Sequence, residues 1–156
     1  MNALIVYFSK FGNTQMVAEA IAERIAAGLE PEGTVQVISL DSLSAEDLKE
    51  KDLVVMGSPT HNMNLPKNVR PVFESLPKRV LKGIPVAAFD TSYKMSWWLN
   101  HFTAAKRLSQ KQRKLGGKRI VPPETFLVMG REGPLYDGEL ERSRAWAASI
   151  LEGMEN

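Results

Sequence analysis

Cysteine is absent from this chain of 156 residues, and histidine occurs only twice. The absence of cysteine excludes disulfides, thiolate metal ligands and a cysteine nucleophile. Two histidines without a His-Glu-x-x-His pattern disfavour a catalytic zinc site. No apolar run reaches the roughly 18 residues that a membrane-spanning helix needs. The composition, 44% hydrophobic and 24% charged, is that of a globular protein, so disordered and collagen-like classes are excluded as well.

The N-terminal segment, residues 1–8, has neither a basic lead nor a small-residue cleavage site. A secretory signal peptide is therefore not expected, and a cytoplasmic location is the default expectation. The chain length fits one domain, which we expect to extend over residues 1–156.

The net charge of +2 conceals a basic middle segment. Residues 1–82 contain 9 Lys or Arg and 10 Asp or Glu, a net charge of −1. Residues 83–122 contain 8 and 1, a net charge of +7, and residues 123–156 contain 3 and 7, a net charge of −4. The basic segment is a feature that any functional interpretation must explain.

Short apolar runs alternate with helical patterns along the chain. Each run predicts a strand, at residues 4–8, 34–40, 52–57, 84–90 and 118–129, the last interrupted at Pro122-Pro123. Helices are expected between them: one ending near Gly28, a short one opening at the capping box of residues 44–47, and others over 66–76, 98–115 and up to Met154. Asp137 is the expected cap of the final helix.

Strands that alternate with helices predict an α/β fold with a parallel sheet and helices on both faces. The two common strand orders for such a sheet are the Rossmann and the flavodoxin-like order. In both, ligands bind at the carboxyl ends of the strands. The loops after the first, third and fourth strands are therefore the candidate functional segments.

The first of these loops, residues 9–14, is small and rich in hydroxyl groups. Gly12 permits a tight backbone path, and Ser9 and Thr14 supply hydroxyls. The following helix offers unpaired N–H groups and the positive end of its dipole. This combination can bind a phosphate without an arginine. An ordinary turn with a threonine cap explains the same residues equally well.

The segment Val6-Tyr7-Phe8-Ser9-x-x-Gly12-Asn13-Thr14 resembles the N-terminal fingerprint of the flavodoxin family, in which a hydroxyl-rich loop binds the phosphate of FMN. Residues 57–61 (GSPTH) and 89–93 (FDTSY) stand where that family has its second and third flavin loops. The resemblance covers essentially the whole chain. It implies a three-layer sandwich whose five-stranded parallel sheet has the order 2-1-3-4-5. Response-regulator receivers share this order but need an acidic cluster where Ser9 stands, and low-molecular-weight tyrosine phosphatases need a cysteine.

The resemblance also implies a role for individual residues around a non-covalent FMN. The phosphate would be held by backbone N–H groups and hydroxyls of Ser9, Phe11, Gly12, Asn13 and Thr14. One side of the isoalloxazine would be lined by Pro59, Thr60, His61 and Asn62, and the other by Asp90, Thr91, Ser92 and Tyr93. Lys10 is expected to point to solvent.

The second loop departs from the pattern of many flavodoxins, which place an aromatic ring there to stack on the flavin. His61 is its only ring, and Met63 its apolar candidate. His61 fits a flavin contact and a solvated loop residue equally well. Tyr93 is the best stacking candidate of the third loop, with Trp97 as the alternative.

The basic segment contains one strongly cationic helix. Arg107, Lys111, Lys114 and Lys118 follow each other at helical spacing, so most of them share one face. A solvated helix face is the ordinary explanation. However, no acidic residue occurs between Asp90 and Glu124, so a docking surface for an acidic redox partner is a second hypothesis. We expect this charge on the side of the domain that bears the third loop. Binding of nucleic acid is disfavoured because no recognised motif accompanies the charge.

The function that the resemblance implies is electron transfer through FMN to or from redox partner proteins, with no catalytic side chain and no metal. Two alternatives remain at this point. One is an FMN-dependent reductase of quinones or similar acceptors that uses a nicotinamide donor. The other is a flavodoxin-like binding or regulatory module without FMN. The sequence does not distinguish among oligomeric states.

Overall fold

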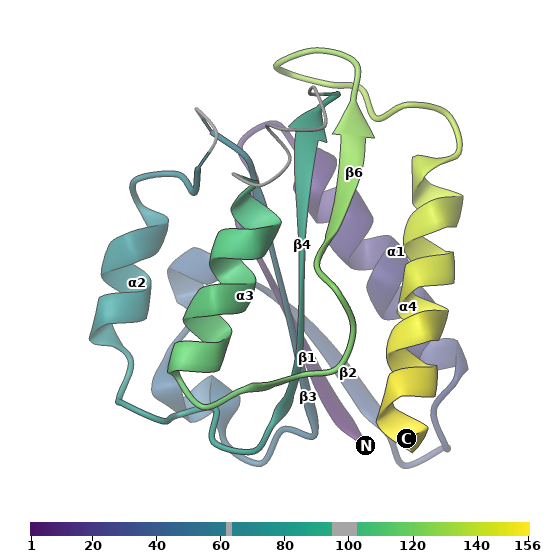
Figure 1. Cartoon of the computed structure of the whole chain (residues 1–156). Coiled ribbons are helices and arrows are strands. Elements are labelled where there is room, and N and C mark those ends of the chain that lie inside the picture. Colours follow the sequence, from purple (N-terminus) through teal and green to yellow (C-terminus); the bar gives the residue numbers. More distant parts are fainter. Residues whose placement is uncertain (62–63, 95–102) are drawn as a thin grey trace.

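The computed structural model of this chain describes residues 1–61, 64–94 and 103–156. A central sheet is covered by helices on both faces, which makes a three-layer sandwich (Figure 1). The strands of the sheet are β1 Asn2–Tyr7, β2 Thr34–Ser39, β3 Leu53–Pro59, β4 Pro85–Tyr93, β5 Lys118–Arg119 and β6 Glu124–Val128. The helices are α1 Asn13–Ala27, α2 Val69–Ser75, α3 Ala104–Lys114 and α4 Glu139–Glu155, with 3₁₀ turns at Leu40–Ser42 and Ala45–Leu48.

The strand order confirms the predicted flavodoxin-like topology. The path runs β2-β1-β3-β4-β5, and each pair on it is parallel. The sixth strand, β6, also pairs with β4 in parallel, with Asp90 opposite Thr125. The last predicted strand is thus two short strands that share β4 as a neighbour. Pro122 and Pro123 lie between them, as expected of residues that have no N–H to donate to a ladder.

The alternation of side chains along the strands creates two cores. Ile5, Val55 and Phe89 point to the face covered by α1 and α4, while Leu4, Val54 and Val86 point to the face covered by α2 and α3. On the first face, Phe89, Phe126 and Trp146 form an edge-to-face cluster with ring centroids 6.0–6.1 Å apart. The Phe89 ring also explains Gly57, because a Cβ at that position would lie 2.0 Å from the ring.

Several predicted helix boundaries are confirmed and others are wrong. The first helix ends at Gly28, and Ser44 forms the predicted capping box with Asp47. Pro71 is tolerated because it lies in the first turn of α2. The helix predicted over 98–115 is α3, which begins at Ala104; its predicted start at Trp98 lies outside the described residues. Asp137 does not cap α4, because the cap position is Gly138 in a left-handed conformation.

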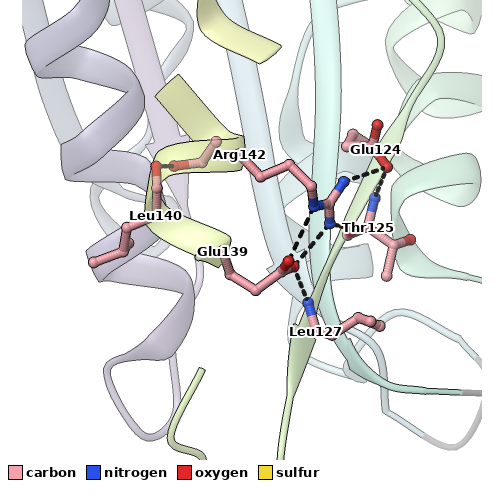
Figure 2. Close-up of polar contacts among 7 residues, drawn as sticks. Glu124, Thr125, Leu127, Glu139, Leu140 and Arg142 are labelled. Atoms are coloured by element: carbon pink, nitrogen blue, oxygen red, sulfur yellow. Dashed lines mark hydrogen bonds and ion pairs between the residues drawn. The ribbon is translucent and has the colours of Figure 1, made fainter. Parts of the chain in front are cut away.

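The outer edge of β6 is occupied by charged side chains of α4 (Figure 2). Glu139 accepts a hydrogen bond from the Leu127 amide at 2.7 Å, and the Arg142 guanidinium donates to the Thr125 carbonyl. Arg142 also pairs with Glu139 at 2.8 Å and with Glu124 at 3.2 Å. Burial disfavours the charged form of Glu139, but the bonds from Arg142 and Leu127 outweigh it and lower its pKa. This Glu139–Arg142 clasp ties the start of α4 to the sheet.

Within the described residues, no helix combines the length and the apolar character that crossing a membrane requires.

Candidate functional site

A cleft of about 600 Å³ opens at the carboxyl edge of the sheet. Its size falls within the range of cofactor sites in proteins, roughly 300–1,000 Å³. Loops after β1, β3, β4 and β6 contribute its walls, so the three segments expected from the sequence meet here with a fourth. The lining residues are Phe8, Ser9, Lys10, Phe11, Asn13, Thr14, Pro59, Thr60, His61, Pro66, Thr91, Ser92, Tyr93, Val128 and Arg131.

The loop after β1 leads directly into the first turn of α1. Gly12 occupies the cap position with φ 92° and ψ −10°, a left-handed conformation that favours glycine. The Ser9 hydroxyl accepts a hydrogen bond from the Gly12 amide at 3.0 Å, which closes the loop into a tight turn. Ser9, Phe11, Asn13 and Thr14 all line the cleft, and Gly12 provides the backbone turn between them.

Thr14 connects this loop to the one after β4. It is 1% exposed, and its hydroxyl lies 2.8 Å from that of Thr91. Only one of the two hydroxyls can donate in that contact, so the proton of the other remains for a further acceptor. Thr14 is therefore not the simple helix cap of the ordinary-turn interpretation, because α1 has no side-chain cap bond from the described residues.

The N-terminus of α1 differs from those of α3 and α4 at the same edge of the sheet. The first turn of α4 contains Glu139 and Glu141, and the carboxylate of Asp90 lies against the first turn of α3, near the Ala104 and Ala105 amides. The first turn of α1 contains no acidic residue. Its positive dipole end and free N–H groups are thus available to an anion in the cleft.

The loop after β3 forms the second wall. Thr60 is tied to the third loop through its amide, which donates to the Thr91 carbonyl at 2.9 Å. His61 and Asn64 exchange two backbone hydrogen bonds of 2.7 and 3.0 Å, which hold these two residues side by side. Pro59, Thr60 and His61 line the cleft as expected. The predicted contact Asn62, and Met63, lie outside the described residues.

The loop after β4 forms the opposite wall with Thr91, Ser92 and Tyr93. Tyr93 is 46% exposed and stands at the mouth, where an aromatic ring can cover a bound ligand. Trp97, the alternative stacking residue, lies outside the described residues.

Asp90 does not line the cleft, contrary to the expectation from the sequence. Its side chain is fully buried on the α3 side of β4, where the Thr60 hydroxyl donates to its Oδ2. That hydroxyl in turn accepts a 2.9 Å bond from the Ala104 amide. Burial raises the Asp90 pKa to about 6, although hydrogen bonds from Thr125, Thr60 and the α3 amides oppose the shift. Asp90 thus stabilises the second loop through Thr60, from outside the cleft.

Five cleft residues were not among the predicted contacts: Phe8, Lys10, Pro66, Val128 and Arg131. Lys10 is exposed, as expected, but it also borders the cleft, with its ammonium 5.5 Å from the Phe11 ring centroid. Arg131 comes from the loop between β6 and α4, more than 100 residues from the first loop. No local pattern around Arg131 indicates this proximity; it results from the tertiary fold.

The basic helix points its charge away from this site. Because α3 runs antiparallel to the strands, its N-terminus contacts Thr60 at the cleft edge, while Lys118 pairs with Pro85 at the opposite edge. Lys111 is half-buried with its ammonium 5.6 Å from the Phe73 ring centroid. The expectation that this charge lies beside the third loop is therefore wrong for Lys111, Lys114 and Lys118. Arg107, one turn from the start of α3, is also half-buried rather than fully solvated.

Comparison with known proteins decides the family. The family model described as flavodoxin matches residues 5–146 of this chain. The chain belongs to the flavodoxin family. Flavodoxins carry electrons through a bound flavin, so this family member is an electron-transfer flavoprotein.

Individual relatives agree with this membership. The chain is 26% identical to a flavodoxin of Clostridium saccharobutylicum, covering 96% of this chain and 95% of that one. It is 34% identical over 134 residues to NADPH-dependent diflavin oxidoreductase 1 of Emericella nidulans, which covers 78% of this chain. The chain spans only 19% of the length of that larger protein.

Solved flavodoxin structures share the fold. A flavodoxin from the domain Archaea superposes with a TM-score of 0.76 at 25% identity, over 100% of both chains. Flavodoxin 2 from Bacillus cereus superposes with a TM-score of 0.80 at 21% identity, over 97% of this chain and 99% of that one.

Proposed function

We propose that the cleft binds one FMN non-covalently and that the protein exchanges electrons with redox partner proteins through it. The observation that carries the proposal is the N-terminus of α1, which lacks carboxylates and opens into a cleft of about 600 Å³. The phosphate of FMN would lie against this N-terminus, and the isoalloxazine would lie between the second and third loops.

The residues of the first loop fit a phosphate group. Gly12 holds the backbone in a turn that leaves the first N–H groups of α1 without intrahelical acceptors. The hydroxyls of Ser9 and of the Thr14–Thr91 pair border the same space. None of the described lining residues carries a carboxylate, so nothing among them repels a dianion.

The other walls fit a flat, largely apolar ring. Pro59, Pro66 and Tyr93 supply apolar surface. The hydrogen bond from the Thr60 amide to the Thr91 carbonyl holds the two walls together. A bound flavin would supply the redox chemistry, in steps of one or two electrons. The chain would hold and orient the ring and limit its contact with water. The contacts of Asn62 and Trp97 remain predictions.

We infer that redox partners dock at the mouth of the cleft rather than on the far end of the basic helix. Two exposed aromatic side chains line the cleft, Phe11 at 42% and Tyr93 at 46% exposure, and Met129, 60% exposed, follows the lining residue Val128. Lys10 and Arg131 border the same opening, so an acidic partner surface would be complementary to it. The name of the Emericella relative supports a reductase that oxidises NADPH as the electron donor.

Titration calorimetry of the purified apoprotein with FMN, FAD and riboflavin tests the proposal. We expect FMN to bind most tightly, because the helix N-terminus and hydroxyls act on its terminal phosphate. Absence of FMN binding, or equal affinity for riboflavin, would contradict the proposed site. Loaded protein should accept electrons from NADPH slowly alone and rapidly with an added flavoprotein reductase. Fast unaided turnover of NADPH with a quinone would favour the reductase alternative.

A further inference from the structure

The segment between β6 and α4 passes over the first loop of the cleft. Val128 and Leu135 form an antiparallel bridge, closed by the Met129 amide donating to the Pro134 carbonyl at 2.8 Å and the Tyr136 amide donating to the Leu127 carbonyl at 3.0 Å. Residues 129–134 therefore form a closed loop whose two ends are joined, and Arg131 lies near its tip.

This loop is attached to the first residue of α1. The Asn13 side-chain amide donates to the Glu132 carbonyl at 3.0 Å. Gly133 lies so close that a Cβ there would be 2.5 Å from Asn13 Oδ1, and its φ of 100° is itself in the left-handed region. The left-handed backbone favours glycine, and a side chain at this position would displace that of Asn13. The loop that bears Arg131 is thus fixed against the helix N-terminus at which the phosphate is proposed to bind.

The far end of the same segment is also anchored. The Glu139–Arg142 clasp joins the first turn of α4 to the Thr125 and Leu127 backbone (Figure 2). The loop is consequently held by the β-bridge, by Asn13 and by α4. Arg131 is presented to the cleft by a supported loop, and it lines the cleft together with Ser9 and Asn13.

The charge of Arg131 is not used within the described structure. The six ion pairs found among residues 1–61, 64–94 and 103–156 involve Arg70, Arg142, Arg144 and Lys49 as cations, and Arg131 is in none of them. Lys10, the other cation at the cleft, lies over the Phe11 ring. A guanidinium that borders an anion site without a carboxylate partner is suited to bind that anion, since its planar fork matches phosphate oxygens.

We propose that Arg131 forms an ion pair with the phosphate of the bound flavin nucleotide and so determines the preference for FMN over riboflavin. The inference rests on the proposed function of the cleft. It adds a side-chain cation to a site that the sequence alone presents as made of backbone N–H groups and hydroxyls. Discrimination against uncharged flavin then depends on a loop that is distant in sequence. The close contact of Asn13 with Gly133 holds this loop beside the start of α1.

Binding of FMN and riboflavin to Arg131→Gln, Arg131→Lys and the wild type tests this inference. Arg119→Gln is the matched control, because it removes the same charge from the exposed strand β5 at the opposite edge. For Arg131→Gln we expect FMN affinity to fall about tenfold, as for a lost charged hydrogen bond that is partly screened by solvent. Riboflavin affinity should change less than about twofold, because riboflavin has no phosphate for the ion pair. Arg131→Lys should recover part of the loss, and Arg119→Gln should resemble the wild type.

Salt provides a second readout. The wild-type affinity for FMN should decline with rising ionic strength more steeply than that of Arg131→Gln, since screening weakens the ion pair that the variant lacks. Three results would overturn the inference while leaving the proposed function intact: unchanged FMN affinity in Arg131→Gln, equal losses for FMN and riboflavin, or an equal loss in Arg119→Gln. Failure of the wild type to bind FMN would overturn both.

Discussion

The N-termini of α1 and α4 have almost the same backbone but opposite electrostatics. Each helix follows a glycine in the left-handed region, Gly12 with φ 92° and ψ −10° and Gly138 with φ 86° and ψ −9°. Neither receives a side-chain cap bond from the described residues. Both helices cover the same face of the sheet and begin at its carboxyl edge (Figure 1). They differ in charge, because α4 begins with two glutamates within its first turn and α1 has none.

This difference separates a helix start that is neutralised within the protein from one that we propose binds an anion. Glu139 places negative charge beside the start of α4 and uses the same carboxylate to bond the β6 backbone and Arg142. The N-terminus of α4 is thereby neutralised within the protein. The start of α1 keeps its positive end unneutralised and faces the cleft. The start of α3 is a third case, in which the carboxylate comes from Asp90 on a neighbouring strand.

The largest expected effect concerns Asp90, whose buried carboxylate lies at the start of α3. Its pKa is raised from 3.8 to about 6, so between these pH values the folded protein binds more protons than the unfolded chain. The free energy of unfolding should therefore fall by about 3 kcal/mol as the pH rises through this interval, and the contribution should be constant above it. Asp90→Asn should lack this slope. Urea denaturation from pH 4 to pH 8 measures it, and parallel profiles for the two proteins would contradict the assignment.

Placing a carboxylate on α1 should make its start resemble that of α4. Asn13→Asp puts a negative charge in the first turn, beside the proposed phosphate position. We expect FMN affinity to fall by about 2–3 kcal/mol through charge repulsion near the surface. Asn13→Ala is the control, because it removes the 3.0 Å bond to Glu132 without adding charge. Calorimetry that gives equal affinities for the two variants would show that the charge is not what matters.

Breaking the Glu139–Arg142 clasp at the start of α4 should affect stability rather than ligand binding. Arg142→Ala leaves the Glu139 side chain, 10% exposed, without its cation and the Thr125 carbonyl without its donor. We expect the free energy of unfolding to fall by about 2 kcal/mol. The matched control is Arg144→Ala, whose partners Glu23 and Glu141 are exposed, with an expected change below about 0.5 kcal/mol. Equal destabilisation of the two variants in urea would show that the clasp has no special role.

The Thr14–Thr91 hydroxyl pair beside the first loop should have a smaller effect. Thr14→Ala removes one hydroxyl from the cleft and leaves that of Thr91, a residue only 4% exposed, without its partner. We expect a loss of about 1 kcal/mol in FMN affinity and a similar loss in stability. Thr34→Ala, at an exposed position on β2, is the control. If FMN binds the Thr14 variant as tightly as the wild type, these hydroxyls do not contact the phosphate.

The smallest effect is expected from the far end of α3 and the adjoining strand β5. Lys111, Lys114 and Lys118 lead away from the cleft toward the opposite edge of the sheet, so replacing them with glutamine should change FMN affinity less than about twofold, given screening over about 10 Å. Fluorescence titration of the triple variant checks this. A large change in FMN affinity would contradict the conclusion that the charge of these lysines lies too far from the cleft to act on it.

The strands and the hydroxyl-rich loop at the start of α1 could be predicted from the sequence because their signals are local. Residues 4–8 and 52–57 are apolar runs long enough for strands buried on both faces, and Gly12 precedes a helical stripe. The capping box at Ser44 and the interruption at Pro122-Pro123 are local signals as well. Asp90 follows the fourth strand as expected, but its side chain lies on the α3 side of β4 and does not line the cleft. Because both faces of β4 are covered, the sequence around it has no polar-apolar alternation that would reveal which face a side chain occupies.

By itself, the sequence therefore determined the order of the elements, the parallel sheet and the hydroxyl-rich loop at the start of α1, since each depends on neighbouring residues. Only the tertiary structure decided what surrounds that loop. It turned Asp90 toward α3, directed the C-terminal end of the basic helix to the opposite edge, and brought the loop that contains Arg131 against Asn13, more than 100 residues away in sequence. These outcomes depend on the handedness of the crossovers and on close contacts such as Gly133 against Asn13, which no stretch of sequence encodes alone.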